Sequence, residues 1–242
     1  MSEVDVFDDR VCALGEGPLW HPERGQLFWF DILGKRLLSR DGDRALAWEF
    51  DEHVSAAGWI DAEALLIASE TGLWRFDIAT GARRRLAALE AGNPATRSND
   101  GRADPFGGFW IGTMGKAAEP GLGAIWRYFR GRLERLFSGL TIPNAICFSP
   151  DGRWAFFADT PTRLIRRVAL DGEGWPRGRP EALVDLATAG LNPDGAVTDA
   201  EGALWVAQWG AGRVARFDAE GRFLSALDLP AAQVSCPAFG GA

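Results

Sequence analysis

A weak internal repeat is the feature that most constrains the fold of this chain of 242 residues. A turn, most often of the type Asp/Ser-x-x-Gly, is followed by an apolar run five times: HPERGQLFWFD, DAEALLIASE, DPFGGFWIGT, SPDGRWAFFAD and DAEGALWVAQ. The copies start 40, 43, 45 and 50 residues apart, at His21, Asp61, Asp104, Ser149 and Asp199. Further short apolar runs follow most copies. Repeats of this length with about four strands each are typical of a β-propeller.

The sequence therefore predicts an all-β fold, a six-bladed β-propeller with the last blade incomplete in this chain, as a single domain over residues 1–242. Short runs between Gly, Pro and Asp turns fit antiparallel hairpins, and no stretch has a long helical period. A solenoid is the alternative, although its usual repeats contain helices or are shorter. The final segment CPAFGGA resembles the opening of a sixth copy, and VDVFDD near the N-terminus could supply a strand that closes the ring.

Composition and charge exclude several classes of function. A net charge of −7 and a pI near 5.0 argue against nucleic-acid or anionic-membrane partners. The N-terminus lacks the apolar core of a signal peptide, and no apolar run has the length of a membrane span. Cys12, Cys147 and Cys236 form no CxxC pair, so we expect reduced thiols and a cytoplasmic protein. Two histidines and no GxSxG give little support to a serine hydrolase. The oligomeric state stays open.

Four polar residues share one position in the repeat. Glu16, Asn99, Asn144 and Asp194 each precede the turn of their copy by five residues. Equivalent positions near the start of the innermost strands of a propeller converge at one mouth of the channel, where carboxylates and carboxamides would form an oxygen-only cation site. The alternative is that they are strand caps or Asx turns. The second copy has Ala56 there, which would leave one side of the ion open, as a catalytic ion requires.

Six motifs together indicate a family. LGEGPLW, SAAGW, RSNDGRADPFGGFWIGTM, IPNAICFSPDG, NPDGAVTDAEGALWVAQWG and SCPAFGG run in the order of the SMP-30/gluconolactonase/regucalcin-like family, which the chain resembles over essentially its whole length. The resemblance implies a six-bladed propeller that binds one divalent cation through Glu16, Asn144 and Asp194. Ca²⁺, Zn²⁺, Mn²⁺, Mg²⁺ and Fe²⁺ all remain open for such a site. Family members continue past FGG with strands of the sixth blade, so we expect a truncated form.

The resemblance also implies an activity. It predicts hydrolysis of a small-molecule sugar lactone, an aldonolactone such as gluconolactone, to the aldonic acid. Asp194 would be the catalytic base as well as a metal ligand, and Arg97 and Asn99 would contact the substrate. Glu119, in the loop segment GKAAEPGLG, could contact substrate hydroxyls.

Other functions stay open from sequence. The chain could be a non-catalytic calcium- or metal-binding regulatory propeller, a homologue inactivated by truncation, or a phosphotriester hydrolase that uses the same ion. A protein-interaction propeller of the WD40 or kelch type is less well supported, because its signatures do not recur in each copy.

Overall fold

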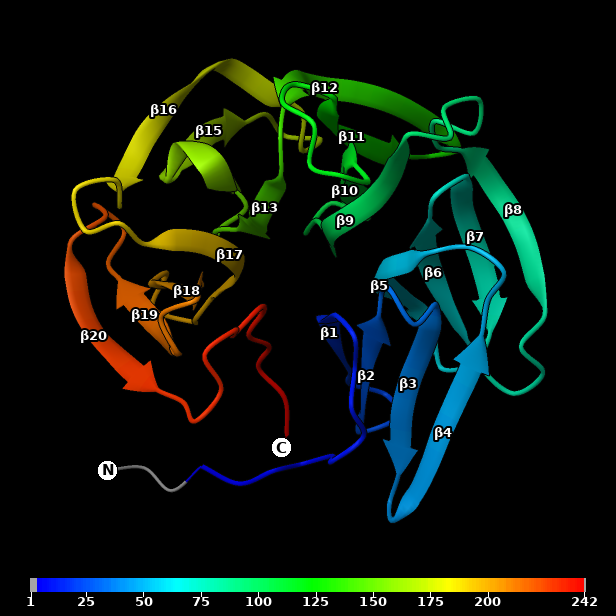
Figure 1. Ribbon diagram of the computed structural model, residues 1–242. Coiled ribbons are helices and arrows are strands. Elements are labelled where there is room, and N and C mark those ends of the chain that lie inside the picture. The colour runs from blue at the N-terminus through cyan, green and yellow to red at the C-terminus, as the bar shows by residue number, and fades with distance from the viewer. Residues whose placement is uncertain (1–3, 242) are drawn as a thin grey trace.

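Five four-stranded antiparallel sheets surround a central channel in the computed structural model, which describes residues 4–241 (Figure 1). Strands follow one another in each sheet in chain order, as in the blades of a propeller. The blades are β1 (Gly15–His21), β2 (Gln26–Asp31), β3 (Arg36–Asp41) and β4 (Arg44–Glu49); β5 (Val54–Asp61), β6 (Ala64–Ser69), β7 (Gly72–Asp77) and β8 (Arg83–Ala88); β9 (Thr96–Ala103), β10 (Phe109–Gly115), β11 (Gly123–Phe129) and β12 (Arg132–Leu140); β13 (Pro143–Phe148), β14 (Trp154–Asp159), β15 (Leu164–Leu170) and β16 (Pro176–Asp185); β17 (Asn192–Thr198), β18 (Leu204–Trp209), β19 (Arg213–Phe217) and β20 (Phe223–Asp228).

The recurrent turn connects the first two strands of a blade. In the fifth blade the Asp199 carboxylate accepts the backbone N–H groups of Glu201 at 3.0 Å and Ala203 at 2.9 Å. Gly202 then takes a φ of +82°, a left-handed conformation that other residues rarely adopt. The Asp-x-x-Gly phrase is thus a side-chain-stabilised turn, and the apolar run that follows it is the second strand.

The first strand of every blade lines the channel. Figure 1 shows β1, β5, β9, β13 and β17 nearest the centre, and neighbouring members of this set pack on one another. Apolar clusters fill the spaces between consecutive blades, from the first blade to the fifth. Burial of these residues stabilises the ring by about 25 cal/mol for each Å² of apolar surface removed from water.

The C-terminal segment lies between the fifth and first blades, at the inner position of a sixth (Figure 1). The backbone N–H of Gly195 in β17 donates to the Ser235 carbonyl at 2.7 Å, and the Ser235 hydroxyl donates to the Gly15 carbonyl at 2.6 Å. Five complete blades and this segment give the six-fold arrangement that the sequence predicts.

The closing strand that VDVFDD could have supplied near the N-terminus is not formed. Residues 4–9 adopt no strand in the described part of the chain. Phe7 instead packs its ring against Trp29 of the first blade, with centroids 6.1 Å apart, and Arg40 lies over the Phe7 ring. The aromatic residue, rather than backbone pairing, therefore fixes this segment.

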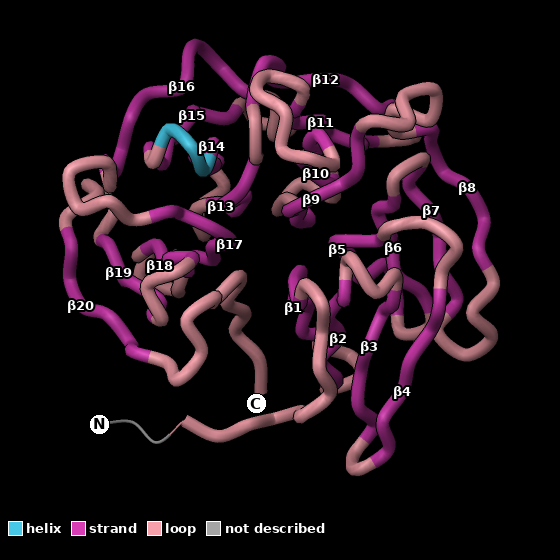
Figure 2. Tube along the Cα trace, in the orientation of Figure 1, coloured by secondary structure: helices cyan, strands magenta, loops and turns pink. Residues whose placement is uncertain are grey.

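Helix is confined to one short turn in residues 4–241, the 3₁₀ segment η1 (Thr160–Thr162) (Figure 2). None of the described helical segments is long and apolar enough to cross a membrane.

Candidate functional site

Each predicted site residue of the channel lies at an irregularity of its innermost strand. In all five blades the innermost strand has one residue more than its neighbour near this position, which is a β-bulge; in the second blade, which has Ala56 there, it lies between Val54–Ser69 and Ala56–Ala68. The pairing shifts between Glu16–Phe30 and Leu19–Phe28, between Ser98–Thr113 and Gly101–Ile111, between Asn144–Ala158 and Cys147–Phe156, and between Pro193–Gln208 and Ala196–Val206. A bulge redirects side chains and is frequent beside functional sites. The common offset in the sequence thus corresponds to a common backbone feature.

Close packing holds the first of these bulges. Gly17, directly after Glu16, has a φ of +56°, and a Cβ there would lie 2.2 Å from the Ser55 carbonyl oxygen of the second blade. The backbone N–H of Gly17 donates to the Glu16 carboxylate at 3.1 Å. The conformation therefore favours glycine next to Glu16, and the close approach of the neighbouring blade requires it.

A chain of hydrogen bonds joins the third, fourth and fifth blades. Arg97 Nη1 donates to Asn99 Oδ1 at 2.9 Å, and Asn99 Nδ2 donates to Asn144 Oδ1 at 2.9 Å. Asn144 Nδ2 donates to the Thr160 hydroxyl at 2.9 Å, and that hydroxyl donates to the Pro193 carbonyl at 2.8 Å. This series of hydrogen bonds ends at Pro193, beside Asp194. It fixes the orientation of the carboxamides of both Asn99 and Asn144.

Three acidic side chains, Glu16, Asp100 and Asp194, lie near this series of hydrogen bonds and have raised pKa values. Burial raises the pKa of Glu16 to about 8, with a contribution from the negative charge of Asp100. Burial also raises the pKa of Asp194 well above its ordinary value, and the charges of Glu16 and Asp100 add to that effect. Burial raises the pKa of Asp100, while Arg102 opposes the shift. The channel therefore concentrates acidic groups that resist ionisation together.

This set of donors fits a hard divalent cation. The carboxylates of Glu16 and Asp194 supply negative oxygens, and Asn144 Oδ1 keeps a second lone pair besides the one that accepts from Asn99. Among residues 4–241 no group of three or more His, Cys, Asp or Glu is arranged to hold a metal, so an ion here would depend on two carboxylates and a carboxamide. Such an ion would offset the cost of burying these carboxylates and the repulsion among them, which together raise both pKa values.

Arg97 is a buried cation at this end of the channel. Its side chain is buried, and burial lowers its pKa, while the charges of Glu16 and Glu70 act in the opposite direction. Its Nη1 is held by Asn99 and by the Ser98 carbonyl at 2.9 Å. A guanidinium has five N–H donors, so this anchoring leaves donors for a ligand.

Glu119 is placed differently. Its carboxylate accepts the backbone N–H of Ala117 at 3.1 Å within its own loop. Lys116, where this loop begins, donates to Glu70 at 2.8 Å and so ties the loop to the second blade. The structure does not bring Glu119 into the hydrogen-bonded chain, and its contact with substrate stays a prediction.

The shared offset in the repeat does not mark two further residues of this region. Thr160, in η1, links Asn144 to the fifth blade, and Asp100 accepts the backbone N–H of Ile146 at 2.7 Å between two blades. Asp100 stands in the same polar segment of the sequence as Arg97 and Asn99, and that position is the signal that points to it. Thr160 follows β14 and no repeat position marks it, so no signal in the sequence points to it.

The comparisons with known proteins agree with this architecture. The family model described as SMP-30/Gluconolactonase/LRE-like region matches residues 14–242. A protein of Rhizobium meliloti that is provisionally named a sugar lactone lactonase is 43% identical, over 100% of this chain and 85% of its own length. The L-arabinolactonase of Azospirillum brasilense is 34% identical, over 99% of this chain and 82% of its own length.

A solved structure shares the fold. The crystal structure of a calcium-binding protein, regucalcin, from Agrobacterium tumefaciens superposes with a TM-score of 0.94 at 41% identity. The match covers 97% of this chain and 80% of that chain.

Proposed function

The chain belongs to the SMP-30/gluconolactonase/LRE-like family, and we propose that it hydrolyses a sugar lactone with the help of a divalent cation at the mouth of the channel. The observation that carries the proposal is the series of hydrogen bonds that runs from the buried Arg97 through Asn99 and Asn144 to the strand of Asp194. The negative charge of Glu16 acts on Asp194 beside it. The lactonase names of relatives that match over nearly the whole chain support the reaction class.

We assign the cation to Glu16, Asn144 and Asp194. When bound, such an ion polarises a carbonyl group or lowers the pKa of a water molecule. The carboxamide of Asn144 would present its oxygen to the ion because Asn99 and Thr160 fix both ends of the amide.

Asp194 is the proposed general base. Its carboxylate would accept a proton from the water that attacks the lactone carbonyl carbon, and a tetrahedral oxyanion would form. When the ring C–O bond breaks, the departing alkoxide would take the proton from the Asp194 carboxylic acid. The products are one hydroxyl group and one carboxyl group, which is the hydroxy acid.

Arg97 and Asn99 are the proposed substrate-binding pair. The remaining N–H groups of Arg97 would donate to sugar hydroxyls or to the oxyanion, where a preorganised donor is most effective. Asn99 positions Arg97 through its Oδ1. We retain Glu119 as a candidate contact for substrate hydroxyls, through movement of its loop.

Asp194→Asn tests the assignment of the base. With gluconolactone or arabinonolactone and a saturating divalent ion, we expect kcat to fall by at least about 100-fold, the usual contribution of a general base. Asp228→Asn, an exposed carboxylate at the end of β20, is the matched control and should retain turnover. Full activity of Asp194→Asn would exclude this residue as the base.

A calcium-binding protein without turnover is the second candidate, favoured by the match to regucalcin. Calorimetry with Ca²⁺ and a lactone panel separates the two. Binding of Ca²⁺ without hydrolysis of any lactone would support the second candidate.

A further inference from the structure

A cavity opens at the end of the channel opposite to the proposed catalytic residues. Its volume is about 650 Å³. The site residues lie in the first half of the innermost strands, whereas this cavity is lined by the ends of those strands, including Ile60, Ala103, Phe148 and Thr198. All the innermost strands run the same way along the channel, so the two sites are at opposite mouths.

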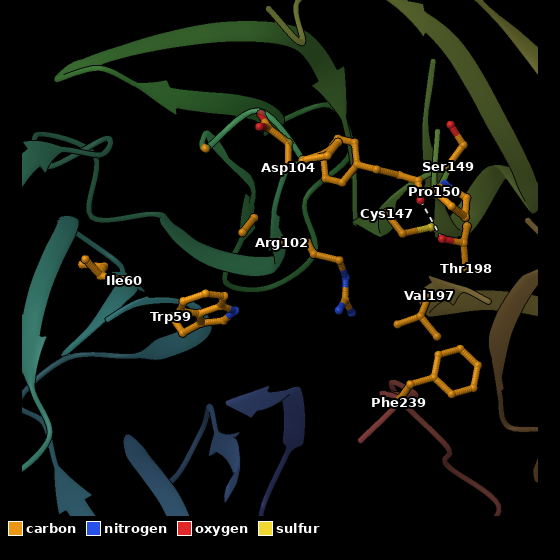
Figure 3. A pocket seen from close by; sticks show the side chains of 14 residues that line it. Trp59, Ile60, Arg102, Asp104, Cys147, Ser149, Pro150, Val197, Thr198 and Phe239 are labelled. Atoms are coloured by element: carbon orange, nitrogen blue, oxygen red, sulfur yellow. Dashed lines mark hydrogen bonds between the residues drawn. The ribbon is translucent and has the colours of Figure 1, made fainter. Parts of the chain in front are cut away.

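The walls of this cavity are largely apolar. Trp59, Ile60 and Phe239 are 42%, 39% and 54% exposed, which is unusual for side chains of this size and type. Trp59 lies across the opening from Phe239, and Val197 lies beside Phe239 (Figure 3). The Thr198 hydroxyl is already committed, since it donates to the Phe148 carbonyl at 2.6 Å.

One cation points into this apolar space. Figure 3 shows the Arg102 guanidinium directed into the opening between Trp59 and Val197. Its hydrogen bonds go to neutral acceptors, the Ile146 carbonyl at 3.2 Å from Nε and the Cys236 sulfur at 3.8 Å from Nη2. Asp100 interacts with this guanidinium through charge, and the N–H groups not used in these two hydrogen bonds are available to an anion.

We propose that this cavity is a second binding site, for a small organic monocarboxylate with an apolar or aromatic body. A guanidinium matches a carboxylate in a bidentate geometry, and the charge-assisted hydrogen bonds are strongest where water is partly excluded. Trp59 and Phe239 would cover the apolar body. An aldonate does not fit this cavity, because its hydroxyl groups would lose water against apolar walls. The site is therefore distinct in chemistry from the proposed lactonase site.

Calorimetry on the full chain tests this proposal with three probes: phenylacetate, its neutral amide phenylacetamide, and gluconate. We expect phenylacetate to bind at least about tenfold more tightly than phenylacetamide, the ratio that a charge-assisted hydrogen bond gives. Gluconate should not bind at this mouth. Equal affinity for phenylacetate and phenylacetamide, or no binding of phenylacetate, would overturn the proposal.

Two variants locate the binding. Arg102→Gln should lose the preference for phenylacetate over phenylacetamide, while Arg135→Gln, an exposed arginine on β12, should keep it. Trp59→Ala should weaken the binding of both phenylacetate and phenylacetamide several-fold. Because it leaves the hydrogen bonds of Arg102 in place, it remains informative if Arg102→Gln does not fold. Unchanged affinity in the folded variants would show that the probes bind elsewhere, and would also overturn the proposal.

Discussion

Thr160 shows how a residue that would touch neither ion nor substrate can determine the geometry of the proposed site. Its hydroxyl accepts from Asn144 and donates to Pro193, so it connects the carboxamide ligand to the strand of the proposed base. Groups that orient a metal ligand in this way typically change metal affinity or activity by 10- to 100-fold when they are removed.

Thr160→Val should therefore weaken divalent-ion affinity by about tenfold and reduce kcat, with little loss of fold, because valine keeps the shape but not the hydroxyl. Metal titration followed by calorimetry, and lactone turnover, measure the two effects. Thr162→Val removes another hydroxyl of the same turn, one that donates to the Asp159 carbonyl at 2.7 Å. Equal effects of the two variants would contradict a specific role for Thr160.

The raised pKa values of Glu16 and Asp194 predict an unusual dependence of folding stability on pH. The folded pKa of Glu16 is about 8, above its ordinary value of 4.5, so between these values the folded state binds more protons than the unfolded state. The contribution of the protonated Glu16 to the free energy of unfolding is fully present below about pH 4.5. It is lost as the pH rises towards 8. The raised pKa of Asp194 acts in the same direction.

The melting temperature of the chelator-treated protein should accordingly fall by several degrees between pH 5 and pH 8. Glu16→Gln should flatten that slope, whereas Glu23→Gln, at an exposed turn position, should not. A divalent ion should oppose the loss, since it favours the ionised carboxylates. A melting temperature that rises over this range in the absence of metal would contradict the account.

The β-bulges of the innermost strands explain why four residues with the same offset in the sequence occupy equivalent places in the channel. Each bulge inserts one residue into an innermost strand and so changes which side chains face the channel. The φ of +56° at Gly17 and the equal value at Ala145 place the left-handed residue directly after Glu16 and Asn144.

Gly17→Ala should destabilise the protein by about 3 kcal/mol or more, because the new Cβ would lie 2.2 Å from the Ser55 carbonyl oxygen. Gly25→Ala is a matched control with a φ of +57° and no atom near the added Cβ, and it should cost about 1 kcal/mol from the backbone alone. Urea denaturation gives both values. Equal losses would show that the contact with the second blade does not matter.

The strands and their turns could be predicted from sequence because both depend on neighbours in the chain. The Asp-x-x-Gly turn is stabilised by bonds within five residues, as at Asp199, and it marks the start of each second strand. The bulges could not be predicted, since they depend on register with the next strand. The hydrogen bonds of Thr160 join two blades, the fourth and the fifth, and Phe7 packs on Trp29 where the sequence allowed a strand near the N-terminus. The loop conformation in which the Glu119 carboxylate accepts the Ala117 N–H could not be predicted from the sequence either.

The C-terminal segment connects the fifth blade to the first through hydrogen bonds and so closes the ring. Ser235 bonds to Gly195 and Gly15, which lie next to Asp194 and Glu16. We therefore expect this contact to affect the separation of the two carboxylates that we assign to the cation.

Ser235→Ala should lower the free energy of unfolding by about 1 kcal/mol, the usual net value of one hydrogen bond, and should weaken divalent-ion affinity. Ser225→Ala, exposed on β20, is the control. Urea denaturation and metal titration provide the two measurements. A loss of stability with unchanged ion affinity would separate ring closure from the site.

The most direct test of the account is lactone hydrolysis by the chelator-treated full chain, with and without added divalent ions. We predict that turnover of gluconolactone or a related aldonolactone is lost on chelation and returns with the ion, and that Asp194→Asn does not recover. Undiminished hydrolysis in the metal-free protein, or no hydrolysis of any aldonolactone by a folded protein that binds the ion, would contradict the proposed function.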